Sequence, residues 1–295
     1  MRTAPERTRH FLKPGSLLSQ SHRGAYVPII RFSGSAHSLV VLAIFGITQA
    51  VPAGPPTTIG PSSMYAGPPL LTGTIYAKDT NPRQPLFKFK RVATSSGDNV
   101  NVLRTFTDLE GEPAARELVA YKGDHLVSYQ LEELQIGAAG SARLQREPGN
   151  SVKGAIAFEY TKDLHGSGKT RASNESLRPD TLVGDMVGEF LSSHWNDLAR
   201  GDKVRCRYIV VPRRETVGFT FVKHSETTAG GRPVLIVRME ATSPIIATLV
   251  DPLYFTIEKD SPHRVAQYVG RVTPKLKRGD KWDDLDGIFV FDWPK

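Results

Sequence analysis

The sequence predicts a mainly β protein, built from a strongly curved antiparallel sheet or an incomplete barrel with one principal α-helix (residues 180–200) packed on its concave side. Two features of the chain after residue 69 predict this fold. About a dozen short segments alternate apolar and polar side chains or are rich in β-branched residues, at the spacing of about 8–12 residues typical of sandwiches and barrels. Only one long segment has the apolar spacing of a helix. Because no internal repeat or linker divides residues 70–295, we expect a single β domain there.

The first 53 residues have the composition of an export leader. Residues 39–50 form an uncharged apolar run that is shorter than the roughly 20 residues needed to span a bilayer but suits the apolar region of a signal peptide. A long basic n-region precedes this run, and small residues that suit cleavage end at Ala50 or Ala53. A mitochondrial transit peptide and a core element are the alternatives. We therefore expect a periplasmic or secreted protein that keeps no stable transmembrane anchor after cleavage.

Residues 54–69 are rich in Pro and Gly and predict a flexible segment ahead of the β domain. Strands are predicted at residues 71–77, 87–93, 100–107, 116–122, 125–134, 141–146, 151–161, 203–211, 217–223, 234–241, 245–250, 253–258, 264–272 and 288–291.

The helical segment lies between the two groups of strands. Its apolar residues fall on one broad stripe: Leu182, Val183, Met186, Val187, Phe190, Leu191, Trp195 and Leu198. Asp180 is the expected N-cap and Gly201 the expected stop. Gly184 and Gly188 lie four residues apart, which predicts a close approach of the helix to the sheet.

The net charge and the cysteine content exclude some classes of partner and site. The net charge of +8 invites a nucleic-acid interpretation. However, residues 1–53 hold six basic residues and one acidic residue, and the remainder is nearly balanced. We therefore expect no nucleic-acid partner. Cys206 is the only cysteine, which rules out an intramolecular disulfide and favours a small buried side chain over a reactive thiol.

No motif in the sequence assigns a catalytic, metal or cofactor site. The GSGKT run at 166–170 lacks the first glycine of a phosphate-binding loop, and the DDLDG run at 283–287 lacks two calcium-ligand positions, so a turn is expected at both places. The histidines have no metal-ligand spacing. We expect no cofactor, no metal and no catalytic residue that the sequence alone can name.

Candidate ligand-binding residues come from the helix and from one strand. Met186, Phe190, His194 and Trp195 would face or border a cavity if the helix lines one. Arg238 and Glu240 share one strand face and would form a polar patch within the curved sheet, or solvate its outer face.

The leader followed by an all-β domain, together with the strand–turn–strand run YFTIEKDSPHRVAQYVG at 254–270, resembles a loose group of uncharacterised bacterial exported proteins. Those proteins are similar to incomplete-barrel carriers of the lipoprotein-carrier type, which wrap a sheet around helices and hold a lipid chain. The resemblance implies an incomplete barrel and an apolar ligand. It carries over no catalytic residue.

The leading hypothesis is a secreted envelope protein that binds an apolar ligand, such as a lipid or another small molecule, through a concave surface of sheet and helix. The same surface could instead bind a partner protein of the envelope. The rival hypothesis is a hydrolase-like enzyme whose site assembles from distant loops, with His194, His224 or His263 as the base. A third is an interaction protein that uses an exposed sheet edge.

Overall fold

The structure, a computed structural model, describes residues 67–81, 83–149, 153–164, 166, 168–248 and 250–294. All of them belong to one compact unit, Ala53–Lys295. The expected leader lies outside the described residues, as does most of the expected flexible segment.

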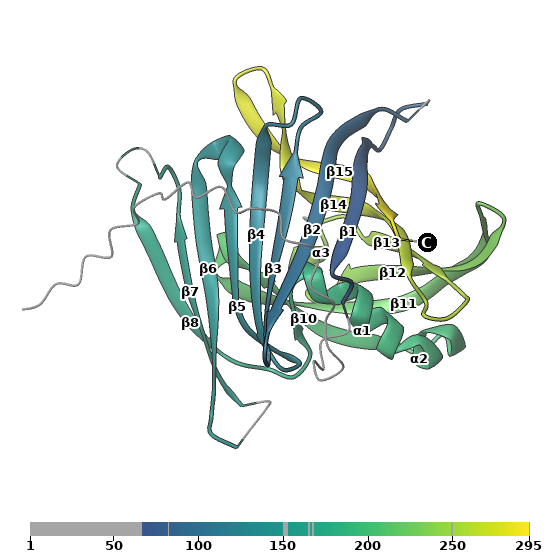
Figure 1. Cartoon of the computed structure of the whole chain (residues 1–295), viewed down its shortest axis with the longest axis horizontal. Helices are drawn as coiled ribbons and strands as arrows, with labels where there is room; N and C mark the ends of the chain where they lie inside the picture. The colour runs from purple at the N-terminus through teal and green to yellow at the C-terminus, as the bar shows by residue number, and fades with distance from the viewer. Residues whose placement is uncertain are drawn as a thin grey trace, which may run out of the picture. The chain divides into compact units, whose positions relative to one another are not determined.

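The predicted fold class is confirmed, because the described chain is mainly β and its strands form one sheet (Figure 1). The order across the sheet is β8-β7-β6-β5-β4-β3-β2-β1-β15-β14-β13-β12-β11-β10-β9. All neighbours pair antiparallel except β9 and β10, which pair parallel. The strands are β1 (Leu70–Ala77), β2 (Pro85–Ser96), β3 (Asn99–Thr107), β4 (Pro113–Lys122), β5 (His125–Glu133), β6 (Ala138–Arg146), β7 (Gly154–Thr161), β8 (Thr170–Ser176), β9 (Thr181–Leu182), β10 (Val204–Val210), β11 (Glu215–Ala229), β12 (Arg232–Ala241), β13 (Leu253–Glu258), β14 (Val265–Arg278) and β15 (Lys281–Asp292).

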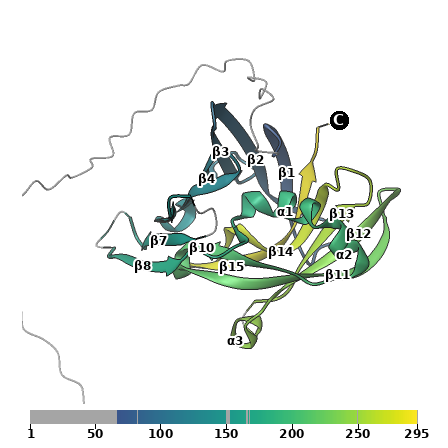
Figure 2. The ribbon, with the colours of Figure 1, turned by 90° about the horizontal axis from the view of Figure 1, so that it is seen from below.

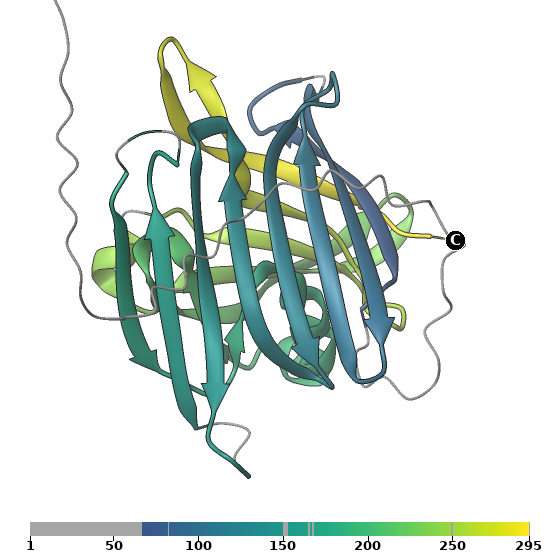
Figure 3. The same ribbon diagram turned by 60° about the vertical axis from the view of Figure 1, so that its left-hand side comes forward.

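The sheet curls into two walls. Strands β1 to β8 form the first wall, drawn in blue and teal at the front of Figure 3, and the strands from β10 onward cross behind it. Phe158 of the first wall shares one apolar cluster with Ile209 of β10 and Val211 of the 3-10 helix η3 (Val211–Arg213), so the walls meet inside. Among the described strands, no backbone ladder joins the two edges β8 and β9, and the barrel is incomplete.

Alternation along the strands places one set of side chains in the interior. Phe87 and Phe89 of β2, Phe106 of β3 and Phe289 of β15 are buried, while their neighbours along each strand are more exposed. The rings of Phe89, Phe106 and Phe289 pack on one another with centroids 4.9–6.3 Å apart. Burying each such ring contributes about 1.5–3 kcal/mol, so the interior face is the main source of stability.

The helical segment is shorter than predicted and begins differently. Thr181 and Leu182 form β9, and Asp180 is left-handed at φ 55° and is not an N-cap. The helical part comprises the 3-10 helix η2 (Gly184–Met186), α1 (Val187–Ser193) and α2 (Trp195–Arg200), and it ends at left-handed Gly201 as expected. The predicted N-terminus was wrong because residues 181 and 182 complete their hydrogen bonds with β10 instead. The segment lies between the two walls (Figure 2).

Three other local predictions differ from the structure. The segment predicted as a strand at 245–250 instead contains α3 (Pro244–Ala247), which starts with proline at its first position. Strand β8 was missed because its sequence, TRASNES, has no apolar face. The expected turn at 283–287 lies inside β15, where Arg271 and Lys275 of β14 pair with Asp284. No helix in the described ranges is both long and apolar enough to cross a membrane.

Candidate binding cavity

A cavity of about 610 Å³ lies between the two walls and the start of the helical segment. This volume is within the range of about 300–1,000 Å³ found for small-molecule sites. Much of the lining is apolar and comes from both walls and α1. The apolar lining residues include Leu71, Phe89, Val187, Val217, Phe219, Met239, Ile246, Val250, Leu253, Phe255, Val265, Val272 and Phe291.

A row of charged side chains crosses the first wall inside this cavity. Arg91 of β2, Arg104 of β3 and Glu117 of β4 are direct partners across adjacent strands. Each occupies the inward phase of its strand, and each is buried. Two arginines side by side repel each other, so the row needs a second carboxylate.

The helical segment supplies that carboxylate. Asp185 of η2 lies 2.6 Å from Arg91 Nε and 4.0 Å from Arg104 Nε, and its side chain is 1% exposed. The hydroxyl of Tyr121 donates to Asp185 Oδ2 at 2.9 Å. Arg104 also pairs with Glu117, whose other oxygen accepts a hydrogen bond of 2.6 Å from Thr273 of β14. The network therefore ties both walls and the helical segment together.

Arg104 is the member of this network that faces the cavity with unused donors. It carries five N–H groups, and among the described residues it donates one hydrogen bond, to Glu117. Its guanidinium lies 5.3 Å from the ring centroid of Phe89 and 5.8 Å from that of Phe106. Burial lowers its pKa, but the charges of Glu117 and Asp185 raise it by more, so Arg104 stays charged.

Three tyrosines line the cavity near this arginine. Burial raises the pKa of Tyr129, Tyr208 and Tyr268, and Glu117 raises each further, so all three hydroxyls stay protonated. In the described part of the chain none of these hydroxyls has a hydrogen-bond partner. The tyrosine hydroxyls and Arg104 therefore present donors to the cavity that have no hydrogen-bonded acceptor among the described residues.

A second charged cluster lines the cavity between β5, β14 and β15. Lys275 Nζ lies 3.1 Å from Glu133 Oε1 and 2.9 Å from Asp284 Oδ1. Tyr160 donates to Glu133 Oε2 at 2.6 Å, and Arg271 also pairs with Asp284. Burial raises the pKa of Asp284, but Lys275 and Arg271 together hold it below its usual value. Each cation here has a carboxylate partner.

The residues singled out on the helix pack elsewhere. Met186 and Phe190 belong to the apolar core against β10–β13, and Phe190 packs on Phe221 with ring centroids 5.7 Å apart. His194 Nδ1 lies 2.9 Å from the Phe190 carbonyl, and Trp195 stacks on His263 with centroids 4.0 Å apart. None of the four is among the described residues that line the cavity. The lining face of the segment is Gly184, Asp185, Val187, Gly188 and Glu189.

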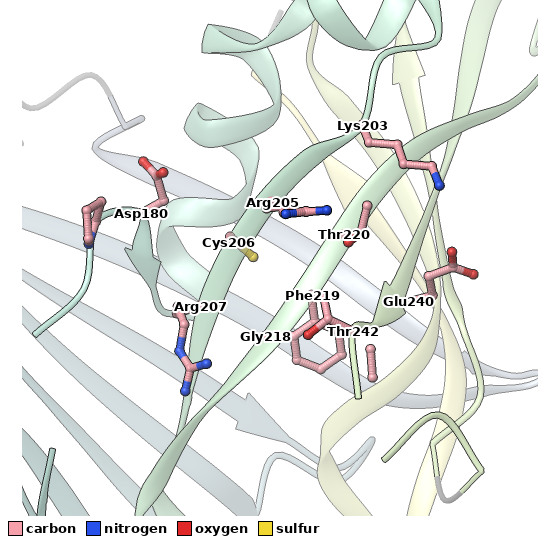
Figure 4. Close-up of a pocket in the computed structure, with 12 residues that line it drawn as sticks. Asp180, Lys203, Arg205, Cys206, Arg207, Gly218, Phe219, Thr220, Glu240 and Thr242 are labelled. Carbon is pink, nitrogen blue, oxygen red and sulfur yellow. The ribbon is translucent and has the colours of Figure 1, made fainter. Parts of the chain in front are cut away.

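Arg238 and Glu240 lie on the outer face of the second wall, where they form an ion pair of 3.1 Å. Glu240 borders an open hollow over β10–β12 that also contains Lys203, Arg205 and Thr220 (Figure 4). Arg205, Thr220 and Glu240 are register partners across three strands. These polar side chains are therefore close together on the outer face, and they do not line the cavity.

None of the three candidate histidine bases is among the described residues that line the cavity. His194 contacts the adjacent Ser193 at 3.1 Å, His224 packs edge-on against Tyr254, and His263 stacks on Trp195. The described residues contain no group of three or more histidine, cysteine or acidic side chains arranged to hold a metal.

Sequence reasoning missed Arg91, Arg104, Glu117 and Asp185. The alternation of side chains along the strand could have identified them. Arg91 follows Phe87 and Phe89 at every second position, so it lies on the apolar face of its strand. Arg104 and Glu117 occupy the same phase in the next two strands. A charged residue at an inward position of an alternating strand is the pattern that could have found them.

Comparisons with known proteins add little. No family model and no curated protein matches the sequence. Among solved structures, the chain is similar to a beta-barrel-like protein of the domain of unknown function DUF1849 from Brucella abortus, with a TM-score of 0.35 and 10% sequence identity. The alignment covers 75% of this chain and 93% of that chain. A likeness of this size supports no conclusion about function, so the geometry of the cavity carries the proposal.

Proposed function

We propose that the protein binds an apolar or amphiphilic small molecule in the cavity between the two walls. The observation that carries this proposal is the cavity itself: about 610 Å³, largely apolar in its lining, with unpaired donors of Arg104 and three tyrosines facing into it. Transfer of an apolar chain from water into such a space is favourable by roughly 25 cal/mol per Å² of surface buried. The polar groups would fix the orientation of the ligand.

Gly188 offers a direct test, because it lines the cavity and a Cβ built on it has no heavy atom within 4 Å. Gly188→Phe places a ring in the cavity, whereas Gly188→Ala adds only a methyl group. We expect the wild-type protein to enhance the fluorescence of the neutral probe N-phenyl-1-naphthylamine. Gly188→Phe should weaken that binding at least about tenfold, or 1.4 kcal/mol, and Gly188→Ala should retain it.

Native mass spectrometry after gentle purification should also detect a small molecule bound to the wild type and depleted in Gly188→Phe. Equal probe binding by the wild type and Gly188→Phe would show that the probe binds elsewhere and would contradict the proposal. Circular dichroism and thermal unfolding of both variants establish that they are folded.

We also propose that this binding takes place outside the cytoplasm, after removal of the leader. The support is the apolar run at 39–50 behind a basic, acid-poor n-region. Sequencing the N-terminus of the mature protein should give a start near residue 51 or 54. Recovery of intact residues 1–40 in a cytosolic fraction would rule out export.

A further inference from the structure

We propose that the ligand is an uncharged amphiphile whose head group accepts hydrogen bonds, such as an ester or amide carbonyl, rather than a free carboxylic acid or another anion. This inference rests on the proposed binding function and adds the chemical class of the ligand. It follows from two independent features of the lining: the kind of hydrogen-bonding group on offer, and the balance of charge.

Arg104 and three tyrosines supply the unused donors in the cavity. Arg104 has N–H groups beyond the one that bonds Glu117, and a guanidinium has no acceptor. Tyr129, Tyr208 and Tyr268 stay protonated, and their hydroxyls have no partner within the described chain. Because these donors face the cavity and have no acceptor among the described residues, the complementary head group is one rich in acceptor oxygens.

The charge balance argues against an anionic head. The described lining contains five basic and five acidic side chains. The arginines beside the free donors are already matched, Arg91 by Asp185 and Arg104 by Glu117. A carboxylate ligand would therefore be an unpaired buried charge, which is expensive.

Glu189 strengthens this argument. It lines the cavity on the helical segment, and burial raises its pKa even though Arg91 acts in the opposite direction. If Glu189 is ionised, it repels an anion. If it is protonated, it adds another donor. An ionised Glu189 therefore disfavours an anionic head group, and a protonated Glu189 can donate to a neutral one.

Two probes with the same chain test the inference: methyl laurate, which carries an ester, and laurate at pH 8, which is ionised. Each competes with N-phenyl-1-naphthylamine on the full mature protein. We expect methyl laurate to displace the probe with an inhibition constant at least about tenfold lower than that of laurate. Equal displacement, or tighter binding of laurate, would overturn the inference.

A matched pair of tyrosine variants tests the donors. Tyr208→Phe removes a hydroxyl that has no protein partner, so it should leave stability nearly unchanged but weaken methyl laurate binding about two- to tenfold, the effect of one hydrogen bond. Tyr254→Phe removes a hydroxyl from a tyrosine that packs edge-on against His224 and does not line the cavity, so it should leave ligand affinity unchanged. The same effect of both variants on methyl laurate binding would contradict the assigned donor role.

The two proposals fail in different ways. If neither the probe nor methyl laurate binds, or if Gly188→Phe leaves both unaffected, the cavity is not the binding site and both proposals fall. If the probe binds in the cavity but laurate is preferred, the binding function stands and only the neutral head group is wrong.

Discussion

At the scale of single residues, the buried pair of Arg104 and Glu117 is the group on which the interior most depends. Their side chains are 9% and 4% exposed, and Glu117 also accepts from Thr273 on the other wall. Removing one partner of a buried pair leaves an uncompensated charge. The intact pair therefore adds little net stability, but removing one of its members would strongly destabilise the contact between the two walls.

We expect Glu117→Gln to lower the free energy of unfolding by about 3 kcal/mol, because Arg104 would keep only the more distant Asp185 as a counter-charge. Glu132→Gln is the matched control: Glu132 pairs with Arg116 between β4 and β5 at 3.6 Å, but on the exposed side. That change should cost about 0–1 kcal/mol. Urea unfolding of the two variants measures the difference, and similar losses would show that the Arg104 pair is not special.

Cys206 gives a second prediction at this scale. Burial raises the pKa of its thiol to about 12, and Asp180 acts in the same direction. Because the thiolate is the reactive form, labelling by a maleimide at pH 8 should be at least about a hundredfold slower in the folded protein than in denaturant. The chain has no other cysteine, so one signal reports on this site. Rapid labelling of folded protein would show that β10 is open to solvent.

The sequence predicted the positions of most strands but not the partners of the buried charged residues. Hydrophobic alternation located most strands, because inward phenylalanines such as Phe87 and Phe89 recur with period two. Arg91 and Arg104 share this inward alternation but were not predicted, and their pairing depends on the register between strands. Register across a sheet depends on distant neighbours and turns, and the sequence pattern of one strand does not contain it.

At the scale of elements, the helical segment has two faces, one packed in the core and one lining the cavity. Its apolar stripe, including Phe190, Leu191 and Leu198, is buried in the core. Its small and acidic face, including Gly184, Asp185 and Gly188, lines the cavity. Ligand contact was expected at Met186, Phe190, His194 and Trp195, but among the residues of the apolar stripe only Val187 is in the described lining of the cavity. Asp185 was not predicted because its partners lie more than 60 residues away in the chain.

The two glycines of this segment should respond in opposite ways to the same change. A Cβ on Gly184 would lie 2.7 Å from Arg104 Nη1 and 3.0 Å from the Tyr208 hydroxyl, whereas a Cβ on Gly188 meets nothing within 4 Å. Gly188→Ala should therefore stabilise the protein by up to about 1 kcal/mol through helix propensity. Gly184→Ala should destabilise it by about 1–3 kcal/mol, because it forces Arg104 away from Glu117.

Thermal unfolding of the two alanine variants measures this pair of effects. A close approach of the helical segment was expected at both glycines, and the structure assigns it to Gly184 alone, against side chains rather than a strand backbone. Stabilisation by Gly184→Ala would mean that Arg104 has room to move. It would contradict the fixed position assigned to Arg104 between Arg91 and Glu117.

At the scale of the whole unit, the incomplete barrel is closed by side chains where backbone pairing stops. Glu175 of β8 accepts hydrogen bonds from the Thr216 amide at 2.9 Å and from the Thr216 hydroxyl at 2.7 Å. Arg207 of β10 donates to the same Thr216 hydroxyl at 2.9 Å, and Ser173 of β8 donates to the Arg214 carbonyl. This seam joins the last strand of the first wall to the second wall. It was invisible in the sequence because β8 is polar on both faces.

We expect the seam to control how far β8 opens. Glu175→Ala removes the acceptor for two donors of Thr216, so amide hydrogen exchange should speed up across residues 170–176 and 214–216. Exchange in β3 and β4 should stay unchanged, because strands on both sides protect them. Glu159→Ala is the control, since Glu159 lies on the adjacent strand β7 and takes no part in the seam. If Glu175→Ala accelerates exchange throughout the sheet, the hydrogen bonds of the seam stabilise the whole fold. If exchange does not change, apolar contacts between η3 and β6–β7 close the barrel without these hydrogen bonds.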